Sequence, residues 1–330
     1  MMSNQNNTLI KTVDLVKEFE ISGGNFFEKN KPRVHATSNV NISVMDGETY
    51  ALVGESGCGK STLGRLMLRL IEPTSGHIEF EGVNINELKD EEMRETRKKM
   101  QIIFQDPYAS INPRMDVYNI IAEPLVTHKI YESKEQTKEK VKELMVKVGI
   151  RPEFINRYPH QFSGGQRQRI GIARALALQP KLIICDEPVS ALDVSIQSQI
   201  LNLLHDLQDE FKLTYLFISH DLSVVRYISN RVCVMFLGKV CEIGDTEELF
   251  GNPLHPYTKF LIDAVPKPDP FLRKENKQLL QGEIPSPVNP PKGCRFHTRC
   301  PYAENICKEL EPELKTFNDR QVACHLVKNV

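Results

Sequence analysis

A glycine-rich segment between a buried strand and an amphipathic helix constrains this sequence more than any other feature. The apolar run 50–53 predicts the strand, and apolar side chains recur at helical spacing between residues 63 and 70. The segment that joins them reads Gly54, Glu55, Ser56, Gly57, Cys58, Gly59, Lys60, Ser61 and Thr62. Its glycines allow backbone N–H groups to turn around phosphate oxygens, and the helix N-terminus adds the positive end of its dipole. The segment therefore fits the P-loop pattern and predicts a site for nucleotide phosphates.

Two pairs of side chains have expected roles in the chemistry of ATP. Lys60 is expected to reach the β- and γ-phosphates, and the Ser61 hydroxyl is expected to bind Mg²⁺. A second buried strand, 182–185, is followed by Asp186 and Glu187. Ligands collect at the carboxyl ends of parallel strands, so Asp186 is predicted to hold Mg²⁺ and Glu187 to orient and deprotonate the attacking water. An acidic pair after a strand is also common as a helix N-cap, so the P-loop upstream decides this interpretation.

The alternation of short apolar runs with helical periodicities predicts an α/β fold, with a mostly parallel sheet covered by helices. A third buried strand is predicted at 215–218, a helix with one apolar face at 196–211 and a solvated helix at 134–147. Prolines concentrate toward the C-terminus, at a density that no helix or central strand tolerates. We therefore expect a main domain over residues 1–245 and an irregular extension over residues 246–330.

Composition excludes several classes of protein. The 330 residues carry 42 Lys and Arg against 43 Asp and Glu, which gives a formal net charge of -1. A protein held to nucleic acid by bulk positive charge would be strongly basic, so no nucleic-acid partner is expected. No apolar run approaches the roughly 18 residues that a membrane span needs, and the N-terminus lacks the apolar core of a signal peptide. The composition therefore predicts a cytosolic chain.

Further motifs follow one another in a fixed order. They are Gln105 in the segment 104–107, the run Ser163, Gly164, Gly165 and Gln166, then Asp193 in 190–193 and His220 in 219–221. Together with the P-loop and the Asp186–Glu187 pair, this set resembles the motifs of ABC-type ATPases, and the resemblance covers essentially the whole chain. It implies a P-loop NTPase core, a helical subdomain at about 106–180 and an irregular, cysteine-bearing C-terminal extension.

The resemblance also implies how these motifs work. In that family two ATPase subunits face each other head to tail, and each ATP lies between the P-loop of one subunit and the signature of the other, here 163–166. Asp193 would link the two subunits. Glu187, His220 and Gln105 would form the catalytic set, in which His220 holds the γ-phosphate and Gln105 contacts the metal and reports its presence to the helical subdomain.

The aromatic side chain that stacks on adenine is a separate expectation. Phe19 has the family's approximate location for it, and an ordinary apolar strand residue is the alternative. Phe26 and Phe27 compete for the same role from an inserted segment, 23–31, that is predicted to be an exposed loop.

The C-terminal extension narrows the resemblance. The segments 252–258 and 293–324 look like the tail of the oligopeptide/dipeptide importer subfamily, and the segments 111–115 and 120–125 are closest to its F-type ATPase subunit. Such a subunit hydrolyses ATP at the cytoplasmic face of the cell membrane as a peripheral protein. The implied partners are a second homologous ATPase subunit, two transmembrane permease subunits and an extracytoplasmic peptide-binding protein. Two alternatives remain. The subunit could serve the import of nickel or another small solute, or the chain could be a soluble ABC ATPase that acts on ribosomes or DNA.

Four cysteines gather in this extension. They are Cys294, Cys300, Cys307 and Cys324. Their spacing lacks the tight pair that structural zinc sites usually show, whereas iron–sulfur clusters accept varied spacing from four thiolates. Relatives of this tail resemble [4Fe-4S] binders, so a cluster is expected. Zinc, for which His297 and His325 could substitute as ligands, and free thiols remain the alternatives.

Overall fold

The computed structural model describes residues 7–21, 31–265 and 282–327. The chain divides into two compact units, one formed by Met1–Glu87 with Ser219–Val330 and the other by Leu88–Ile218. Phe26, Phe27 and most of the inserted segment 23–31 lie outside the described residues, as does part of the proline-rich segment. The expected boundary near residue 245 and the expected helical subdomain at about 106–180 stay predictions.

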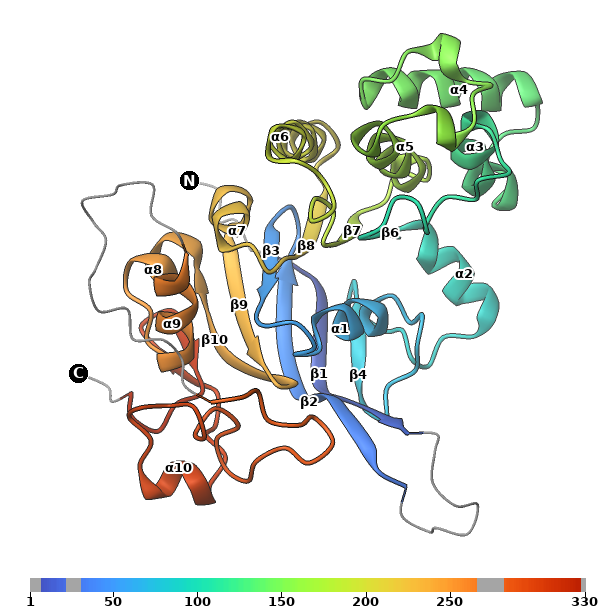
Figure 1. The fold of residues 1–330 in the computed structure, drawn as a ribbon. Helices are drawn as coiled ribbons and strands as arrows, with labels where there is room; N and C mark the ends of the chain where they lie inside the picture. Colours follow the sequence, from blue (N-terminus) through green and yellow to red (C-terminus); the bar gives the residue numbers. More distant parts are fainter. Residues whose placement is uncertain (1–6, 22–30, 266–281, 328–330) are drawn as a thin grey trace, which may run out of the picture. The chain divides into compact units, whose positions relative to one another are not determined.

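The first unit contains an antiparallel sheet that the sequence patterns did not predict (Figure 1). Its strands are β1 (Thr8–Glu20), β2 (Arg33–Met45), β4 (Ser75–Phe80) and β5 (Val83–Asn84), in the order β2-β1-β4-β5. Strand β1 pairs with both β2 and β4, and the pairing with β2 shifts register at several points along the strand. Such bulges break the alternation of apolar and polar residues by which a strand is recognised in a sequence.

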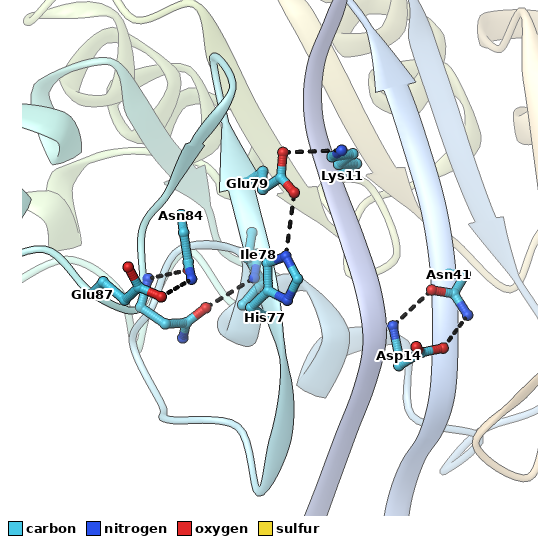
Figure 2. Close-up of polar contacts among 9 residues, drawn as sticks. Lys11, Asp14, Asn41, His77, Ile78, Glu79, Asn84 and Glu87 are labelled. Atoms are coloured by element: carbon cyan, nitrogen blue, oxygen red, sulfur yellow. Dashed lines mark hydrogen bonds and ion pairs between the residues drawn. The ribbon is translucent and has the colours of Figure 1, made fainter.

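Polar side chains tie the strands of this sheet together at the surface, as Figure 2 shows. Glu79 on β4 forms an ion pair with Lys11 on β1 at 2.9 Å and lies 3.2 Å from His77 Nε2. On the other side of β1, the Asn41 amide donates to the Asp14 carboxylate at 2.9 Å. These groups are partly exposed, so they contribute to register more than to stability.

The P-loop of the first unit follows the strand that the sequence predicted. Strand β3 (Thr49–Val53) pairs in parallel with β9 (Arg231–Phe236), which pairs in antiparallel with β10 (Lys239–Asp245). Helix α1 (Lys60–Met67) begins directly after the glycine-rich segment. The predicted helix was too long at its end, because Leu70 lies beyond α1 and is 48% exposed. The short helix α7 (Leu222–Ile228) completes this part of the unit.

The C-terminal segment of the first unit packs onto β10. Its elements are α8 (Thr246–Gly251), α9 (Pro256–Ala264), α10 (Asn305–Glu309), β11 (Lys315–Phe317) and β12 (Arg320–Val322). Strand β12 pairs in antiparallel with β10, and β11 pairs in antiparallel with β12. Glu242 on β10 is fully buried, and its carboxylate accepts hydrogen bonds from the backbone N–H groups of Leu254 at 3.0 Å and His255 at 2.9 Å. The segment therefore supplies the partners of a buried charge.

The second unit combines three parallel strands with five α-helices and two 3₁₀ turns. Its elements are α2 (Asp90–Lys98), β6 (Met100–Ile103), α3 (Val117–Thr127), α4 (Lys134–Lys147), the 3₁₀ turns η1 (Pro152–Phe154) and η2 (Pro159–Gln161), α5 (Gly164–Leu176), β7 (Leu182–Asp186), α6 (Val194–Phe211) and β8 (Thr214–Ile218). Strand β7 pairs in parallel with both β6 and β8. The predicted strands 182–185 and 215–218 and the predicted helix 134–147 are confirmed. The predicted helix 196–211 corresponds to α6, whose buried residues are Ile200, Leu201, Leu204 and Leu207.

Across the described ranges, no helix is both long and apolar enough to cross a membrane.

Candidate functional site

Close backbone packing fixes the shape of the P-loop. Gly54 has φ +148°, and a Cβ there would lie 2.1 Å from the Met235 carbonyl oxygen. Gly59, the N-cap of α1, has φ +104°, and a Cβ there would lie 2.1 Å from the Ala36 carbonyl oxygen. Only glycine fits at either position. Helix α1 has no acidic residue in its first turn and no side chain capping its end, so its N-terminus favours an anion.

Lys60 lies across this loop. Its side chain is 5% exposed, and Nζ donates to the carbonyl oxygens of Gly54 at 2.8 Å and Glu55 at 3.1 Å. The two carbonyl oxygens satisfy the buried amino group at the position where phosphate oxygens are expected. Cys58 beside it is buried, and burial raises the pKa of its thiol, so it stays protonated and unreactive.

His220 belongs to the same unit as the P-loop. The preceding residue, Ser219, donates its backbone N–H to the Leu52 carbonyl at 3.2 Å, on the strand that leads into the P-loop. The following residue, Asp221, caps α7 and accepts from the Ser223 N–H at 2.8 Å. These two anchors fix the backbone on both sides of the exposed His220 side chain.

Phe19 also lies in this unit, near the end of β1. Its ring is 39% exposed, and the Lys17 ammonium lies 4.9 Å from the ring centroid. An exposed aromatic ring is available for stacking on a base, and its role in adenine binding stays a prediction.

In the second unit, the structure brings two predicted catalytic residues together. Gln105 Nε2 donates to Glu187 Oε2 at 2.8 Å. Glu187 follows the buried Asp186 at the end of β7 and has φ +47°, a strained conformation for a residue with a side chain. Its backbone N–H donates to the Ile218 carbonyl of β8 at 3.0 Å, which holds this conformation in place. Backbone strain of this kind is typical of functional sites.

The signature segment forms the N-terminus of helix α5, where Ser163 and Gln166 cap each other's backbone N–H groups. Ser163 Oγ accepts from the Gln166 N–H at 3.4 Å, while Gln166 Oε1 accepts from the Ser163 N–H at 3.1 Å. A Cβ added at Gly165 would lie 2.4 Å from Ile196 Cγ2, so glycine is needed for α5 to approach α6. The N-terminus of α5 carries no acidic residue in its first turn, which favours an anion there, and the role of the signature segment toward ATP stays a prediction.

Asp193 is the N-cap of α6. Its carboxylate accepts from the Ile196 N–H at 3.0 Å and from Ser195 Oγ at 2.8 Å. The hydrogen bond from Ile196 and then the one from Ser195 lower the pKa of Asp193 below its usual value. Asp193 thus has a structural function as a cap, whatever it contributes between subunits.

The four cysteines of the extension line one small pocket together with His255, His297 and His325. Burial raises the pKa of Cys294 to about 11 and also raises the pKa values of Cys300 and Cys324. His297 Nδ1 lies 2.8 Å from the Cys294 carbonyl oxygen, and His325 Nε2 lies 2.9 Å from that of Leu310. Within the ranges the structure describes, no group of three or more His, Cys, Asp or Glu side chains is arranged to hold a metal ion. The thiols are soft donors that suit zinc or iron–sulfur clusters, and they would have to converge further to bind either.

Two residues that sequence reasoning missed contact the P-loop from the C-terminal extension. Tyr257 Oη accepts from the Glu55 N–H at 2.9 Å, and the Arg299 guanidinium donates to Glu55 Oε2 at 2.7 Å. Arg299 lies 244 residues beyond Glu55 in the chain, so no local pattern could have indicated this contact.

Comparison with solved structures places the fold. The dimeric ATP-binding cassette MJ0796, in a post-hydrolysis state bound to ADP and Pi, superposes with a TM-score of 0.63 and 29% identity, covering 72% of this chain and 98% of that chain. CbiO1 of Clostridium perfringens, part of the ABC transporter complex cbiONQ, gives a TM-score of 0.64 and 28% identity, covering 74% and 92% of the two chains. Residues 37–190 match the family described as ABC transporter. Fold and motifs together define an ABC-type ATPase.

The particular family follows from relatives that match nearly end to end. AppF of Bacillus subtilis, an oligopeptide transport ATP-binding protein, is 54% identical over 330 residues, which covers 99% of each chain. OppF of Escherichia coli, with the same description, is 52% identical over 318 residues, covering 96% of this chain and 95% of that protein. Residues 241–307 match the C-terminal region of oligopeptide/dipeptide transporters. This chain belongs to the ATP-binding proteins of the oligopeptide/dipeptide ABC transporter family.

Proposed function

We propose that this protein binds and hydrolyses ATP to power the uptake of oligopeptides or dipeptides across the cell membrane. Two findings support a peptide as the cargo. The C-terminal region matches that of oligopeptide/dipeptide transporters, and similar proteins are described as oligopeptide or di/tripeptide transport ATP-binding proteins. The resemblance of the segments 111–115 and 120–125 supports the F-type subunit. In this proposal residues 1–245 form the nucleotide-binding domain, with a helical subdomain at about 106–180, and residues 246–330 form the transporter-type extension.

The chain's own residues divide the work of ATP hydrolysis. The N–H groups of the P-loop and the Lys60 ammonium bind the phosphates, and Phe19 stacks on the adenine. Oxygen donors from Ser61, Asp186 and Gln105 suit Mg²⁺, which when bound neutralises developing phosphate charge. The remaining members of the phosphate cradle are Gly54, Glu55, Ser56, Gly57, Cys58, Gly59 and Thr62.

Glu187 orients the attacking water and accepts its proton, and His220 holds the γ-phosphate. The Glu187 carboxylate accepts a hydrogen bond from the Gln105 amide at 2.8 Å, and it can turn toward a water molecule when this bond opens. The signature Ser163, Gly164, Gly165 and Gln166 contributes its helix N-terminus to the nucleotide of a facing subunit, and Asp193 lies at that junction.

The proposed assembly needs three kinds of partner. A second homologous ATPase subunit forms a heterodimer with this chain, or a second copy forms a homodimer in isolation. Two transmembrane permease subunits and an extracytoplasmic peptide-binding protein complete the importer. The chain itself is peripheral at the cytoplasmic face of the membrane, with no nucleic acid as a partner.

The four cysteines hold a [4Fe-4S] cluster in this proposal, because four soft thiols line one pocket. Anaerobically purified protein is expected to be brown and to contain about four iron and four sulfide per chain. Cys307→Ser should lose the colour, whereas Cys233→Ala, on strand β9, should keep it. Stoichiometric zinc in a colourless protein, or a tail free of metal, would contradict the cluster.

Co-purification from membranes tests the function as a whole. Tagged protein is expected to bring down a second ATPase and two permeases, and its ATPase activity in vesicles should rise when peptide and the binding protein are added. If nickel or another small solute, rather than peptide, raised the ATPase activity, that solute and not peptide would be the cargo. Recovery with ribosomes or DNA and without permeases would overturn the transport role.

A further inference from the structure

The C-terminal extension contacts the P-loop at Glu55. Three polar groups of Glu55 each have a defined partner. The carbonyl oxygen accepts from Lys60 Nζ at 3.1 Å, the N–H donates to Tyr257 Oη at 2.9 Å, and the carboxylate accepts from Arg299 at 2.7 Å. Two of these three partners come from the extension, and the third is the lysine expected to bind phosphate.

Both extension residues are held firmly. Tyr257 lies fully buried in the first turn of α9, with its ring 4.8 Å from that of Phe236 and 5.2 Å from that of Phe296. The Arg299 side chain is 7% exposed, and the Glu55 side chain is 22% exposed. A charge-assisted hydrogen bond at such low exposure is stronger and less screened than a surface ion pair.

A second set of contacts reaches the loop from its other side. Arg295 donates to the Leu237 carbonyl and to Ser38 Oγ, the latter at 2.8 Å. The neighbouring Gly238 then donates its N–H to the Cys58 carbonyl of the P-loop at 2.9 Å. The extension therefore supports the P-loop both directly at Glu55 and through the turn between β9 and β10.

We propose that Tyr257 and Arg299 are positioning residues of the nucleotide site, which set the conformation of the P-loop and of Lys60 through Glu55. The inference rests on the proposed ATPase function and adds to it a role for the C-terminal extension in nucleotide affinity. Because Glu55 and Lys60 share a hydrogen bond, a shift of the Glu55 backbone moves an acceptor of the phosphate-binding lysine. Neither Tyr257 nor Arg299 has to touch the nucleotide.

Steady-state ATPase kinetics and nucleotide binding by the full-length protein test the proposal. Tyr257→Phe keeps the ring packing and leaves the Glu55 N–H without an acceptor, while Arg299→Gln removes the charge partner. Each variant is expected to raise KM and the dissociation constant for ATP about 5- to 30-fold, the equivalent of one to two lost hydrogen bonds, with a smaller change in kcat. Arg299→Lys should recover part of the affinity.

A double-mutant cycle distinguishes positioning from a general loss of stability. If Arg299 acts through Glu55, adding Arg299→Gln to Glu55→Gln should raise KM no further than the single variants do. Glu313→Gln is the matched control, because it removes an exposed ion pair with Lys315 in the same extension. It should leave KM unchanged.

The outcomes separate this inference from the function on which it rests. A normal KM in both Tyr257→Phe and Arg299→Gln, with only the melting temperature lowered, would overturn the positioning role while leaving the ATPase intact. Additive effects in the double variant would likewise overturn it. If Arg299→Gln fails to fold, Tyr257→Phe decides alone. A wild-type protein that neither binds nor hydrolyses ATP would refute the proposed function itself.

Discussion

Gln105 and Glu187 are joined by a hydrogen bond of 2.8 Å between the amide Nε2 and the carboxylate Oε2. Gln105, which is expected to contact the metal, therefore donates a hydrogen bond to Glu187, which is expected to activate water. In the proposed function this hydrogen bond positions the Glu187 carboxylate, and the amide oxygen of Gln105 would be the atom that holds Mg²⁺.

Glu187→Gln should nearly abolish hydrolysis while ATP binding is retained. A positioned general base contributes roughly 10²- to 10⁴-fold to such rates, and an amide cannot accept the proton. The variant should also accumulate as an ATP-bound dimer, visible as a larger species in size-exclusion chromatography. Glu153→Gln, an exposed residue of η1, is the control and should behave like the wild type. Unchanged turnover in Glu187→Gln would remove Glu187 from its catalytic role.

Lys60→Ala should weaken ATP binding by about 10-fold or more, the effect of losing a charge-assisted contact worth ~1.5 to 3 kcal/mol. The variant also leaves the carbonyl oxygens of Gly54 and Glu55 without their ammonium donor. Isothermal titration calorimetry with ATP measures the change. Lys138→Ala, exposed on α4, should leave the affinity as it is. A normal dissociation constant for Lys60→Ala would contradict the P-loop assignment.

Gly165→Ala should destabilise the protein by about 1 to 3 kcal/mol, because the new Cβ overlaps Ile196 Cγ2 at 2.4 Å. Removing the overlap in Gly165→Ala with Ile196→Ala should recover part of this loss. Gly171→Ala lies in the same helix with nothing within 4 Å of its Cβ, so it should be neutral or stabilising. Chemical denaturation followed by circular dichroism compares the three. Equal stabilities for Gly165→Ala and Gly171→Ala would refute the proposed close packing.

Two substitutions of Asp193 separate its structural function from its expected function between subunits. Asp193→Ala removes the cap of α6 and should cost about 0.5 to 2 kcal/mol, whereas Asp193→Asn keeps a good capping side chain. If the carboxylate also acts at the subunit junction, Asp193→Asn should lower ATPase activity at an unchanged melting temperature. Full activity in Asp193→Asn would limit the residue to its capping role.

The nucleotide motifs could be predicted from the sequence because each rests on local chemistry. The P-loop, the strand that ends at Asp186 and the caps of α5 and α6 all depend on neighbours a few residues away. The antiparallel sheet of β1, β2 and β4 was missed because bulges interrupt its alternation. The contact of Arg299 with Glu55 was missed for a different reason, since it joins residues that lie 244 positions apart in the chain.

The pairing of β12 with β10 places a late segment of the chain on an earlier strand. During synthesis at the ribosome, β10 is made before its partner strand β12. The Glu242 carboxylate on β10 is likewise made before Leu254 and His255, whose backbone N–H groups donate to it. Glu55 likewise gains its Arg299 partner only once the segment 244 residues further along has been made. We therefore expect a nascent chain that stops short of Arg299 to lack a finished ATP site.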